Sequence, residues 1–306
     1  MRLLNIIYLK ETDETCDFIK RFIVKIKKVF NIIEIKNEGG KEICYLPLFK
    51  KKSISKRKIN KFSKKITKIL ESNGTSNIVL SEYLSNLDEL ENSLYSENIN
   101  ILNGRFLFKC LTEEIIKYIL KIKNENIKKS EISILVNDYS EFNQELVMDL
   151  AKKVKTLSIV TNHITKWLKV EESLYNEFGI LLNISNNKRS SLKSSRIIID
   201  IDFPSELINQ YKIFNEAIIV NILNKVQIKS KKFNGINVNY FKISIPPKYK
   251  MDGFINEIVY ESILYKNRLL EARNKITEDK IKIKKLVGNN GYLKENEFNT
   301  KHLTKT

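Results

Sequence analysis

Apolar positions in the first part of the chain alternate between the period of strands and the period of helices. Residues 3–9 are rich in Ile and Leu and predict a strand, and Thr12 is placed to cap a helix that follows it. Two further strand-like runs flank Gly39–Gly40, which predicts a β-hairpin. Because Pro47 lacks a backbone N–H, it favours an edge position for the second strand of this hairpin.

Residues 50–68 contain ten basic side chains and no acidic one. Within this run, apolar residues recur at helical spacing, at Ile59, Phe62, Ile66 and Ile69. This pattern predicts an amphipathic helix with a lysine-coated outer face, which Gly74 ends. The region then adds short strands and one long helix, at 77–80, 98–102 and 106–122. We therefore assign an N-terminal α/β domain to residues 1–125.

From residue 131 onward the pattern becomes regular, because short buried strands alternate with helices. The predicted strands span 132–136, 157–160, 180–184, 196–203 and 216–222. The first helix begins after Ser140, and the second ends at Gly179. Such alternation is typical of a parallel, doubly wound sheet with helices on both faces. We assign this domain to residues 131–250, with the polar segment 124–130 as the connection.

The C-terminal part is predicted to be simpler. A last strand spans 238–245 and ends at two prolines. Residues 254–287 predict a basic amphipathic helix, and the polar residues 288–306 predict a disordered tail. The expected fold class is therefore α/β, with an N-terminal α/β domain and a C-terminal doubly wound, mostly parallel sheet.

The 306-residue chain has a formal net charge of +18, and only eight of its 54 basic residues are arginine. Designed phosphate recognition tends to recruit arginine, whereas a chain rich in Lys, Ile and Asn reflects A/T-rich codons. We therefore interpret the positive charge as a consequence of base composition, and we expect only weak, nonspecific binding to polyanions. A nucleic-acid-binding module that uses the 50–68 helix is the alternative.

Two further features bear on compartment and metal binding. No apolar run approaches the ~20 residues needed to span a bilayer, so no membrane association is expected. The three cysteines have no paired spacing, which suits a reducing compartment, and we expect a cytoplasmic protein. Neither cysteines nor histidines have zinc-ligand spacing, so we predict no metal site.

The segment SIVTNHITKWLKVEESL (158–174) carries a family resemblance. With the strand spacing across 132–222, it resembles the nucleotide-binding domain of two-domain Rossmann dehydrogenases of the shikimate dehydrogenase and glutamyl-tRNA reductase type. In that family an Asn-Arg-Thr-like turn and a lysine-bearing helix follow the second strand, and Thr161, Asn162 and Lys166 stand in comparable places. The resemblance covers about ninety residues. It implies a Rossmann-like fold, and NAD(P)-dependent oxidoreductase activity as an alternative function.

The loop between the first strand and the first helix of this domain departs from the family. It reads NDYSEF (137–142) and contains no glycine. A dinucleotide site needs glycines there, for the tight turn and for close approach to the pyrophosphate. Asp138 and Glu141 place negative charges where the diphosphate would lie, and Tyr139 adds bulk. We therefore predict no NAD(P) and no other cofactor.

Polar residues at the strand ends form the candidate ligand site, because ligands of open parallel sheets bind outside the carboxyl ends of the strands. These residues are Asn137, Asp138, Thr161, Asn162, His163, Lys166, Lys188, Arg189, Asp200, Asp202 and Asn221. Ordinary turn chemistry also favours Asn and Asp at such positions. Asp200 and Asp202 alternate along a strand and so share one face. The basic, serine-rich segment 188–195 would suit a small anionic ligand.

These patterns favour a two-domain protein with a degenerate Rossmann-like domain that acts in binding or regulation rather than catalysis. No residue receives a catalytic role. The alternatives are an oxidoreductase with an atypical cofactor loop and the nucleic-acid-binding module described above.

Overall fold

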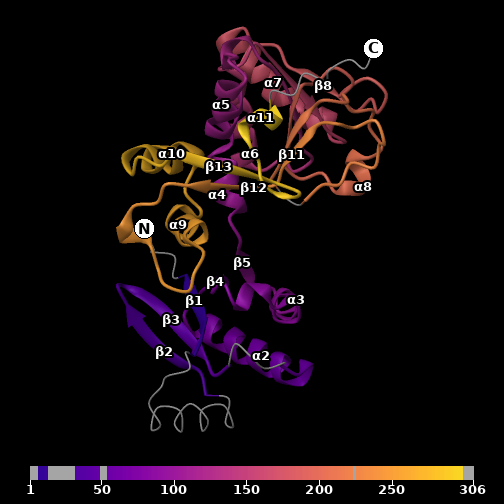
Figure 1. Ribbon diagram of the computed structural model, residues 1–306. Coiled ribbons are helices and arrows are strands. Elements are labelled where there is room, and N and C mark those ends of the chain that lie inside the picture. Colours follow the sequence, from indigo (N-terminus) through magenta and orange to yellow (C-terminus); the bar gives the residue numbers. More distant parts are fainter. Residues whose placement is uncertain (1–5, 13–31, 49–53, 223–224, 299–306) are drawn as a thin grey trace. The chain divides into compact units, whose positions relative to one another are not determined.

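The computed structural model describes residues 6–12, 32–48, 54–222 and 225–298 (Figure 1). The chain forms two compact units. The first combines Met1–Phe106 with Ile245–Tyr265, and the second combines Leu107–Ser244 with Lys266–Thr306. The segment 124–130 therefore lies inside the second unit rather than between units. The helix predicted after Thr12 lies outside the described residues.

The first unit contains a five-stranded sheet in the order β2-β3-β1-β4-β5. Its strands are β1 (Ile7–Glu11), β2 (Glu34–Glu38), β3 (Lys41–Leu46), β4 (Asn77–Leu80) and β5 (Asn100–Leu102). The antiparallel β2–β3 pair confirms the predicted hairpin, and the other neighbours are parallel. The predicted edge position of β3 is wrong, because β3 lies between β2 and β1. Pro47 follows the last residue of β3, so its missing N–H removes no ladder hydrogen bond.

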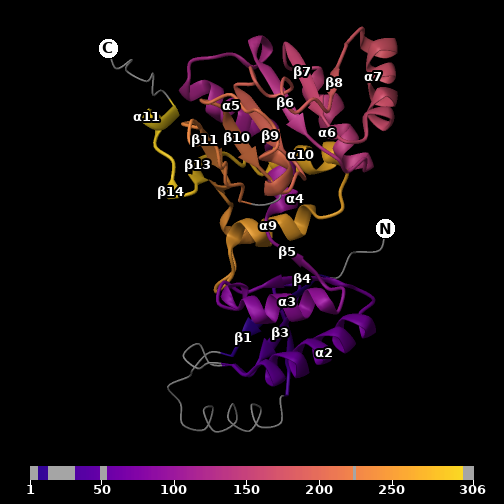
Figure 2. The same cartoon turned by 90° about the vertical axis from the view of Figure 1, so that its right-hand side faces the viewer.

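Helices cover both faces of this sheet. Helices α2 (Lys56–Ser72) and α3 (Asp88–Ser96) share one buried cluster with Leu9, whereas α9 (Asn256–Leu264) shares another with Tyr8. Successive residues of a strand point to opposite faces, so this alternation along β1 builds two cores. The first unit is thus a three-layer α/β/α arrangement, seen from two directions in Figures 1 and 2.

Helix α2 is the amphipathic helix that the sequence predicted. Ile59, Phe62 and Ile66 are buried, and Leu70 rather than Ile69 completes the buried stripe. Gly74 follows the helix with φ +62°, the left-handed conformation that glycine adopts without strain. The lysines of the outer face are largely exposed.

Replacement of Lys61, Lys64 and Lys68 by glutamine is expected to change the free energy of unfolding by less than ~0.5 kcal/mol, because all three side chains are exposed. Urea denaturation measures this change. The same triple variant should bind heparin, a nonspecific polyanion, more weakly than the unmodified protein. Loss of a tight, saturable RNA or DNA affinity at physiological salt would instead support the nucleic-acid-binding alternative.

The second unit contains a six-stranded, fully parallel sheet in the order β11-β10-β9-β6-β7-β8. Its strands are β6 (Glu131–Leu135), β7 (Thr156–Val160), β8 (Asn183–Ser185), β9 (Ile197–Asp200), β10 (Ile218–Asn221) and β11 (Ile236–Val238). This sheet confirms the predicted doubly wound architecture. The predicted strand 238–245 is wrong as one element, because β11 joins this sheet and β12 (Tyr240–Ile243) joins another.

Helices α6 (Glu141–Ala151) and α7 (Ile164–Phe178) pack beside β7 and β8. The short helix α8 (Ser205–Ile208) contributes to a cluster with Leu135 and Ile198 on a sheet face. The crossover between β8 and β9 is a series of turns in place of a helix. The predicted α/β alternation is therefore correct except at this crossover and between β10 and β11, where the described residues form no helix.

The C-terminal part differs from its prediction. The expected helix 254–287 is divided into α9, α10 (Leu269–Glu278) and β13 (Ile283–Gly288). β13 pairs antiparallel with β12 and with β14 (Gly291–Tyr292), and α11 (Glu295–Phe298) follows. Residues 288–298 are therefore structured rather than disordered, while the rest of the predicted tail lies outside the described residues.

The helix predicted at 106–122 is two helices, α4 (Arg105–Cys110) and α5 (Thr112–Ile122). α5 packs beside β13 and α11, which explains why it belongs to the second unit. Across the described ranges, no helix has the length and apolarity needed to cross a membrane.

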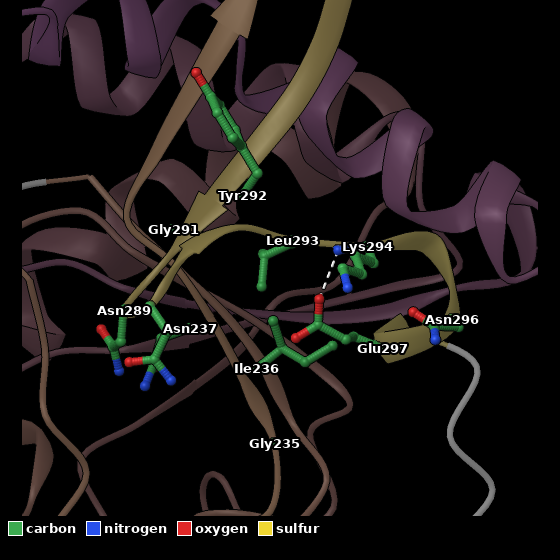
Figure 3. A pocket seen from close by; sticks show the side chains of 11 residues that line it. Gly235, Ile236, Asn237, Asn289, Gly291, Tyr292, Leu293, Lys294, Asn296 and Glu297 are labelled. Carbon is green, nitrogen blue, oxygen red and sulfur yellow. Dashed lines mark hydrogen bonds between the residues drawn. The ribbon is translucent and has the colours of Figure 1, made fainter.

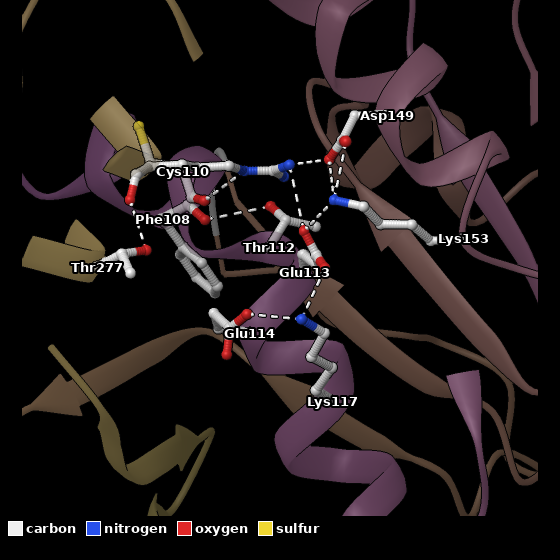
Figure 4. A network of polar contacts seen from close by, with 10 residues as sticks. Phe108, Cys110, Thr112, Glu113, Glu114, Lys117, Asp149, Lys153 and Thr277 are labelled. Atoms are coloured by element: carbon white, nitrogen blue, oxygen red, sulfur yellow. Dashed lines mark hydrogen bonds and ion pairs between the residues drawn. The ribbon is translucent and has the colours of Figure 1, made fainter. Parts of the chain in front are cut away.

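A cluster of charged side chains joins α5, α6 and α10 within the second unit (Figure 4). The nearly buried carboxylate of Glu113 pairs with Lys117 and Lys153, each at 2.7 Å, and with Arg273 at 3.2 Å. Asp149 pairs with Lys153 at 2.8 Å and also with Arg273. These ion pairs hold three helices together, and we interpret the cluster as structural.

Candidate functional site

The strand order of the six-stranded sheet defines where a ligand would bind. Numbered along the chain from β6, the order is 6-5-4-1-2-3, which is the Rossmann arrangement. The direction of the connections reverses between β6 and β9. At this switch point the loops that follow the two strands diverge, and ligands of such folds bind in the crevice between them.

An internal carboxylate lies at this switch point. Asp202, just beyond β9, accepts hydrogen bonds from the backbone N–H groups of Asn137 (2.7 Å) and Asp138 (2.5 Å), just beyond β6. In a dinucleotide-binding Rossmann domain, backbone N–H groups in the corresponding loop bind the pyrophosphate. In this protein the Asp202 side chain already accepts hydrogen bonds from two of these N–H groups.

The Asn137 side chain joins this loop to the loop after β7. Its Oδ1 accepts a hydrogen bond from the backbone N–H of Asn162 at 2.8 Å and a longer one from Thr161 Oγ1 at 3.5 Å. Thr161 Oγ1 in turn accepts the N–H of His163 at 3.0 Å. Four residues predicted from two separate strand ends therefore form one connected network.

Asp138 is fixed by the first turn of α6. Its carboxylate accepts hydrogen bonds from Ser140 Oγ (2.7 Å) and Asn143 Nδ2 (2.9 Å). The other side-chain atom of Asn143, Oδ1, accepts from Lys109 Nζ at 3.1 Å. Burial lowers the pKa of Lys109, and the charges of Asp138 and Asp202 oppose this shift. The network thus contains one partly buried cation beside two carboxylates.

Tyr139 also has a structural contact in this loop. Its ring meets the ring of Trp167 edge-on, at 5.3 Å between centroids, and Trp167 is fully buried. Such aromatic pairs stabilise packing beyond the area they bury. The bulk that replaces a glycine in this loop therefore anchors the loop on α7.

Asp200 is the most strongly perturbed acid of the site. It is buried at the end of β9, and its Oδ1 accepts the N–H of Phe203 at 2.9 Å. Burial raises its pKa to about 8, the Phe203 hydrogen bond opposes the rise, and the charge of Asp202 adds to it. Burial also raises the pKa of Asp202, against its two backbone hydrogen bonds and the charge of Lys109. Asp200 is therefore mainly a neutral carboxylic acid at pH 7.

The side chains of the remaining predicted site residues lie outside this network, which His163 joins only through its backbone N–H. His163 and Lys166 are exposed at the start of α7, and Arg189 is exposed in the crossover. Lys188 donates from Nζ to Gln210 at 2.5 Å. Asn221 ends β10, and its Nδ2 donates to Asn239 at 2.8 Å. The predicted grouping of all strand-end residues is thus only partly realised.

The serines of the crossover form a separate hollow of about 340 Å³ on the sheet face. Their hydroxyls pair with hydroxyls of the strands, as Ser195 does with Ser133 at 2.6 Å and Ser191 with Ser185 at 2.9 Å. Lys188 and Arg189 lie outside the lining of this hollow. The predicted combination of serine and basic side chains is therefore divided between two places.

Sequence reasoning missed Lys109 and Asn143. Asn143 had a detectable signal, because it stands at helical spacing from the buried Leu146, Val147 and Leu150. A polar residue on such a stripe requires hydrogen-bond partners when buried. Lys109 had no comparable signal, because its contact with Asn143 depends on how α4 packs against the rest of the unit.

The chemistry of the site follows from its donors and acceptors. Within the described ranges, no group of three or more His, Cys, Asp or Glu side chains is arranged to hold a metal ion. The backbone N–H groups that could hold a phosphate are bound to the Asp202 carboxylate, and the Asp138 carboxylate lies beside it. The donors and acceptors of this loop therefore bind one another, and its carboxylates give it negative charge.

Comparisons with known proteins gave no match in sequence and only distant likenesses in structure. No protein-family model and no curated protein sequence matches the chain. Among solved structures, the chain is similar to L-tryptophan dehydrogenase from Nostoc punctiforme (TM-score 0.33, 9% identity, 90% of this chain and 86% of that chain). It is also similar to ornithine carbamoyltransferase from Pyrococcus furiosus (TM-score 0.32, 12% identity, 90% and 84%) and to the A chain of dipicolinate synthase from Bacillus subtilis (TM-score 0.32, 9% identity, 74% and 81%). These likenesses concern the fold alone, and the strand order carries the Rossmann-like assignment.

Proposed function

We propose that this protein is a binding or regulatory protein whose Rossmann-like unit works without a dinucleotide cofactor. The supporting observation is the pair of hydrogen bonds from Asn137 and Asp138 to the Asp202 carboxylate. An N–H pair at this place in the fold is suited to an anion, and here the anion is a side chain. A dinucleotide would have to displace Asp202 and approach Asp138 against charge repulsion.

The alternative of an NAD(P)-dependent oxidoreductase would require the loop to open. Tyr139 holds the loop on Trp167, and Asn143 holds it through Asp138. Opening would therefore break several hydrogen bonds and an aromatic contact before any phosphate could bind. These contacts stabilise the closed conformation of the loop, which favours the proposal over the oxidoreductase alternative.

Neither NAD⁺ nor NADP⁺ is expected to raise the melting temperature of the protein. A ligand at 100 times its dissociation constant stabilises the folded state by about 2.7 kcal/mol, so millimolar cofactor would reveal micromolar binding. Differential scanning fluorimetry, with the reduced and oxidised forms of both cofactors, measures this. A clear, saturable rise with the unmodified protein would refute the proposal and restore the oxidoreductase interpretation.

The variant Asp202→Ala tests the physical reason directly. Removal of this carboxylate frees the N–H groups of Asn137 and Asp138 and removes one negative charge. We expect inorganic phosphate to protect this variant more than the unmodified protein in the same assay. Glu141→Ala is the matched control, because it removes a carboxylate from the same segment while Asp202 keeps its hydrogen bonds.

A further inference from the structure

One exposed side of α7, at the periphery of the second unit (Figure 2), is apolar, and no part of the proposed function uses it. Trp167, Val170 and Leu174 are buried and form the inner side of this helix. Leu168 and Tyr175 stand seven residues apart and are 46% and 56% exposed. Residues at this spacing lie on one line along a helix, because seven residues make about two turns. An exposed apolar line therefore runs beside the buried one.

This line continues to the end of the helix and past it. Phe178 is the last residue of α7 and is 49% exposed, and Leu181, three residues further on, is 68% exposed. The described residues expose nine large hydrophobic side chains, and four of these lie within 168–181. Isolated apolar side chains on a surface are ordinary, whereas a group of them marks a binding surface. We refer to Leu168, Tyr175, Phe178 and Leu181 as the α7 row.

Two carboxylates lie within the α7 row. Glu171 and Glu172 follow Leu168 by three and four residues, which a helix brings next to it. Tyr175 is related to the two glutamates in the same way. Neither carboxylate has an ion pair or a hydrogen bond among the described residues. Carboxylates that lack a cation stand out on a chain whose net charge is +18, and they make the middle of the row acidic.

Three lysines border the α7 row without lying on it. Lys169 and Lys166 belong to α7, but they are one and two residues from Leu168, which turns them about 100° and 200° around the helix. Lys152 directly follows α6, and its ammonium lies over the Phe178 ring, 3.7 Å from the centroid. This cation therefore contacts an aromatic face at one end of the row. The two glutamates at the middle keep their charge available to a partner.

We propose that the α7 row is a docking surface for a basic amphipathic helix of a partner protein. The apolar face of such a helix covers the row, and lysines at its edges pair with Glu171 and Glu172. Leu168 and Phe178 are about 15 Å apart along α7, which corresponds to about three turns of a partner helix. The aromatic rings of the row supply the large contact area that interface anchors provide. This surface is separate from the strand-end network, so the proposal does not depend on whether that network binds a ligand.

A second copy of this chain suits the α7 row less well. Glu171 and Glu172 lie at the middle of the row, so two copies paired through it would bring the same carboxylates together, whether the helices run parallel or antiparallel. Carboxylates in contact repel one another, and the lysines of α7 are on another side of the helix. Nucleic acid and anionic lipid meet the same repulsion. A basic helix instead neutralises both carboxylates.

The test is a titration of the full chain with a labelled synthetic peptide, LKKLLKLLKKLLKL, which forms a basic amphipathic helix. The net charge of +18 repels such a peptide in general, so saturable binding reports a local site. We expect fluorescence anisotropy to saturate at physiological salt. The peptide LEELLELLEELLEL has the same apolar pattern and the opposite charge, and any binding of it should not depend on the α7 row. Absence of saturable binding of the lysine peptide overturns the proposal.

Two double variants locate the binding on α7. Leu168→Ala with Tyr175→Ala removes apolar contact area from exposed positions, and we expect the lysine peptide to bind at least about tenfold more weakly. Glu171→Gln with Glu172→Gln keeps the shape and removes the charge, so binding should weaken severalfold and lose most of its salt dependence. Melting temperatures check that both proteins are folded. If the alanine variant fails to fold, the glutamine variant decides the test.

Tyr292→Ala is the matched control. Tyr292 is 57% exposed, close to the value for Tyr175, and it lines a pocket of about 510 Å³ beside β11 (Figure 3). β11 and β8 are opposite edges of the six-stranded sheet, and α7 packs beside β8. The Lys285 ammonium lies 4.8 Å from the centre of the Tyr292 ring, so a cation already occupies this aromatic side chain. The control variant should bind the lysine peptide as the unmodified protein does.

Two further outcomes contradict a docking surface for a basic helix. Binding that survives both double variants, or that Tyr292→Ala weakens equally, places the peptide elsewhere and overturns the proposal. Analytical ultracentrifugation supplies the last measurement. A dimer of the unmodified protein that Leu168→Ala with Tyr175→Ala dissociates would assign the α7 row to a second copy of this chain, which also overturns the proposal.

Discussion

The Asp200→Asn variant is expected to be more stable than the unmodified protein at pH 8 by ~2 kcal/mol or more. Burial raises the pKa of Asp200 to about 8, against an ordinary value of 3.8. The folded state therefore binds a proton that the unfolded state releases, and stability is lost as the pH rises from about 4 through 8. Asparagine resembles the neutral acid and still offers an oxygen to the N–H of Phe203.

Urea denaturation between pH 5 and pH 9 measures this effect as a difference between variant and unmodified protein. The difference should be smallest at pH 5, grow by at most about 1.4 kcal/mol per pH unit, and level off above pH 8. Asp252→Asn is the matched control, because it removes one negative charge from an exposed position of the same basic chain. A stability difference that stays constant across this range would show that Asp200 does not titrate as expected.

The fold was largely predictable because its strands are short, apolar and regularly spaced. The doubly wound sheet followed from β6, β7, β9 and β10, whose inner residues are nearly all buried. The division into units was not predictable. It depends on Ile245–Tyr265 returning to the first unit, and α9 supplies the second face of that sheet. Tertiary packing determines where this segment folds, and it leaves no local pattern in the sequence.

The candidate site was predictable in outline and not in detail. Strand-end rules identified Asn137, Asp138 and Asp202 because turn residues at the carboxyl ends of a parallel sheet converge. They could not show that Asp202 would bond to the other two, since its position depends on how the β9 loop bends back. The pocket beside β11 was missed because β11 is three residues long and its partners, 289–297, were predicted to be disordered.

The Glu113→Gln variant is expected to lose about 2 kcal/mol of stability. The Glu113 carboxylate forms ion pairs with Lys117, Lys153 and Arg273 (Figure 4). The substitution replaces this carboxylate with a neutral amide, so the three cations lose their charged partner. Loss of one partner of a fully buried ion pair costs more, but the lysines are partly exposed and solvent screens part of the interaction. Chemical denaturation at pH 7 measures the loss.

The pH dependence of this loss identifies its cause. Burial alone would raise the pKa of Glu113, but the hydrogen bonds from Lys117 and Lys153 and the charge of Arg273 outweigh burial and lower it below its ordinary 4.5. The stabilisation is therefore fully present above pH 4.5, and it disappears as the pH falls through the lowered pKa of the folded state. Glu114→Gln is the matched control, because Glu114 is exposed and pairs with Lys117 at 2.9 Å. This control should change stability by less than ~0.5 kcal/mol. Equal losses in the two variants would mean that helix propensity or net charge, rather than the buried carboxylate, joins α5 to α6 and α10.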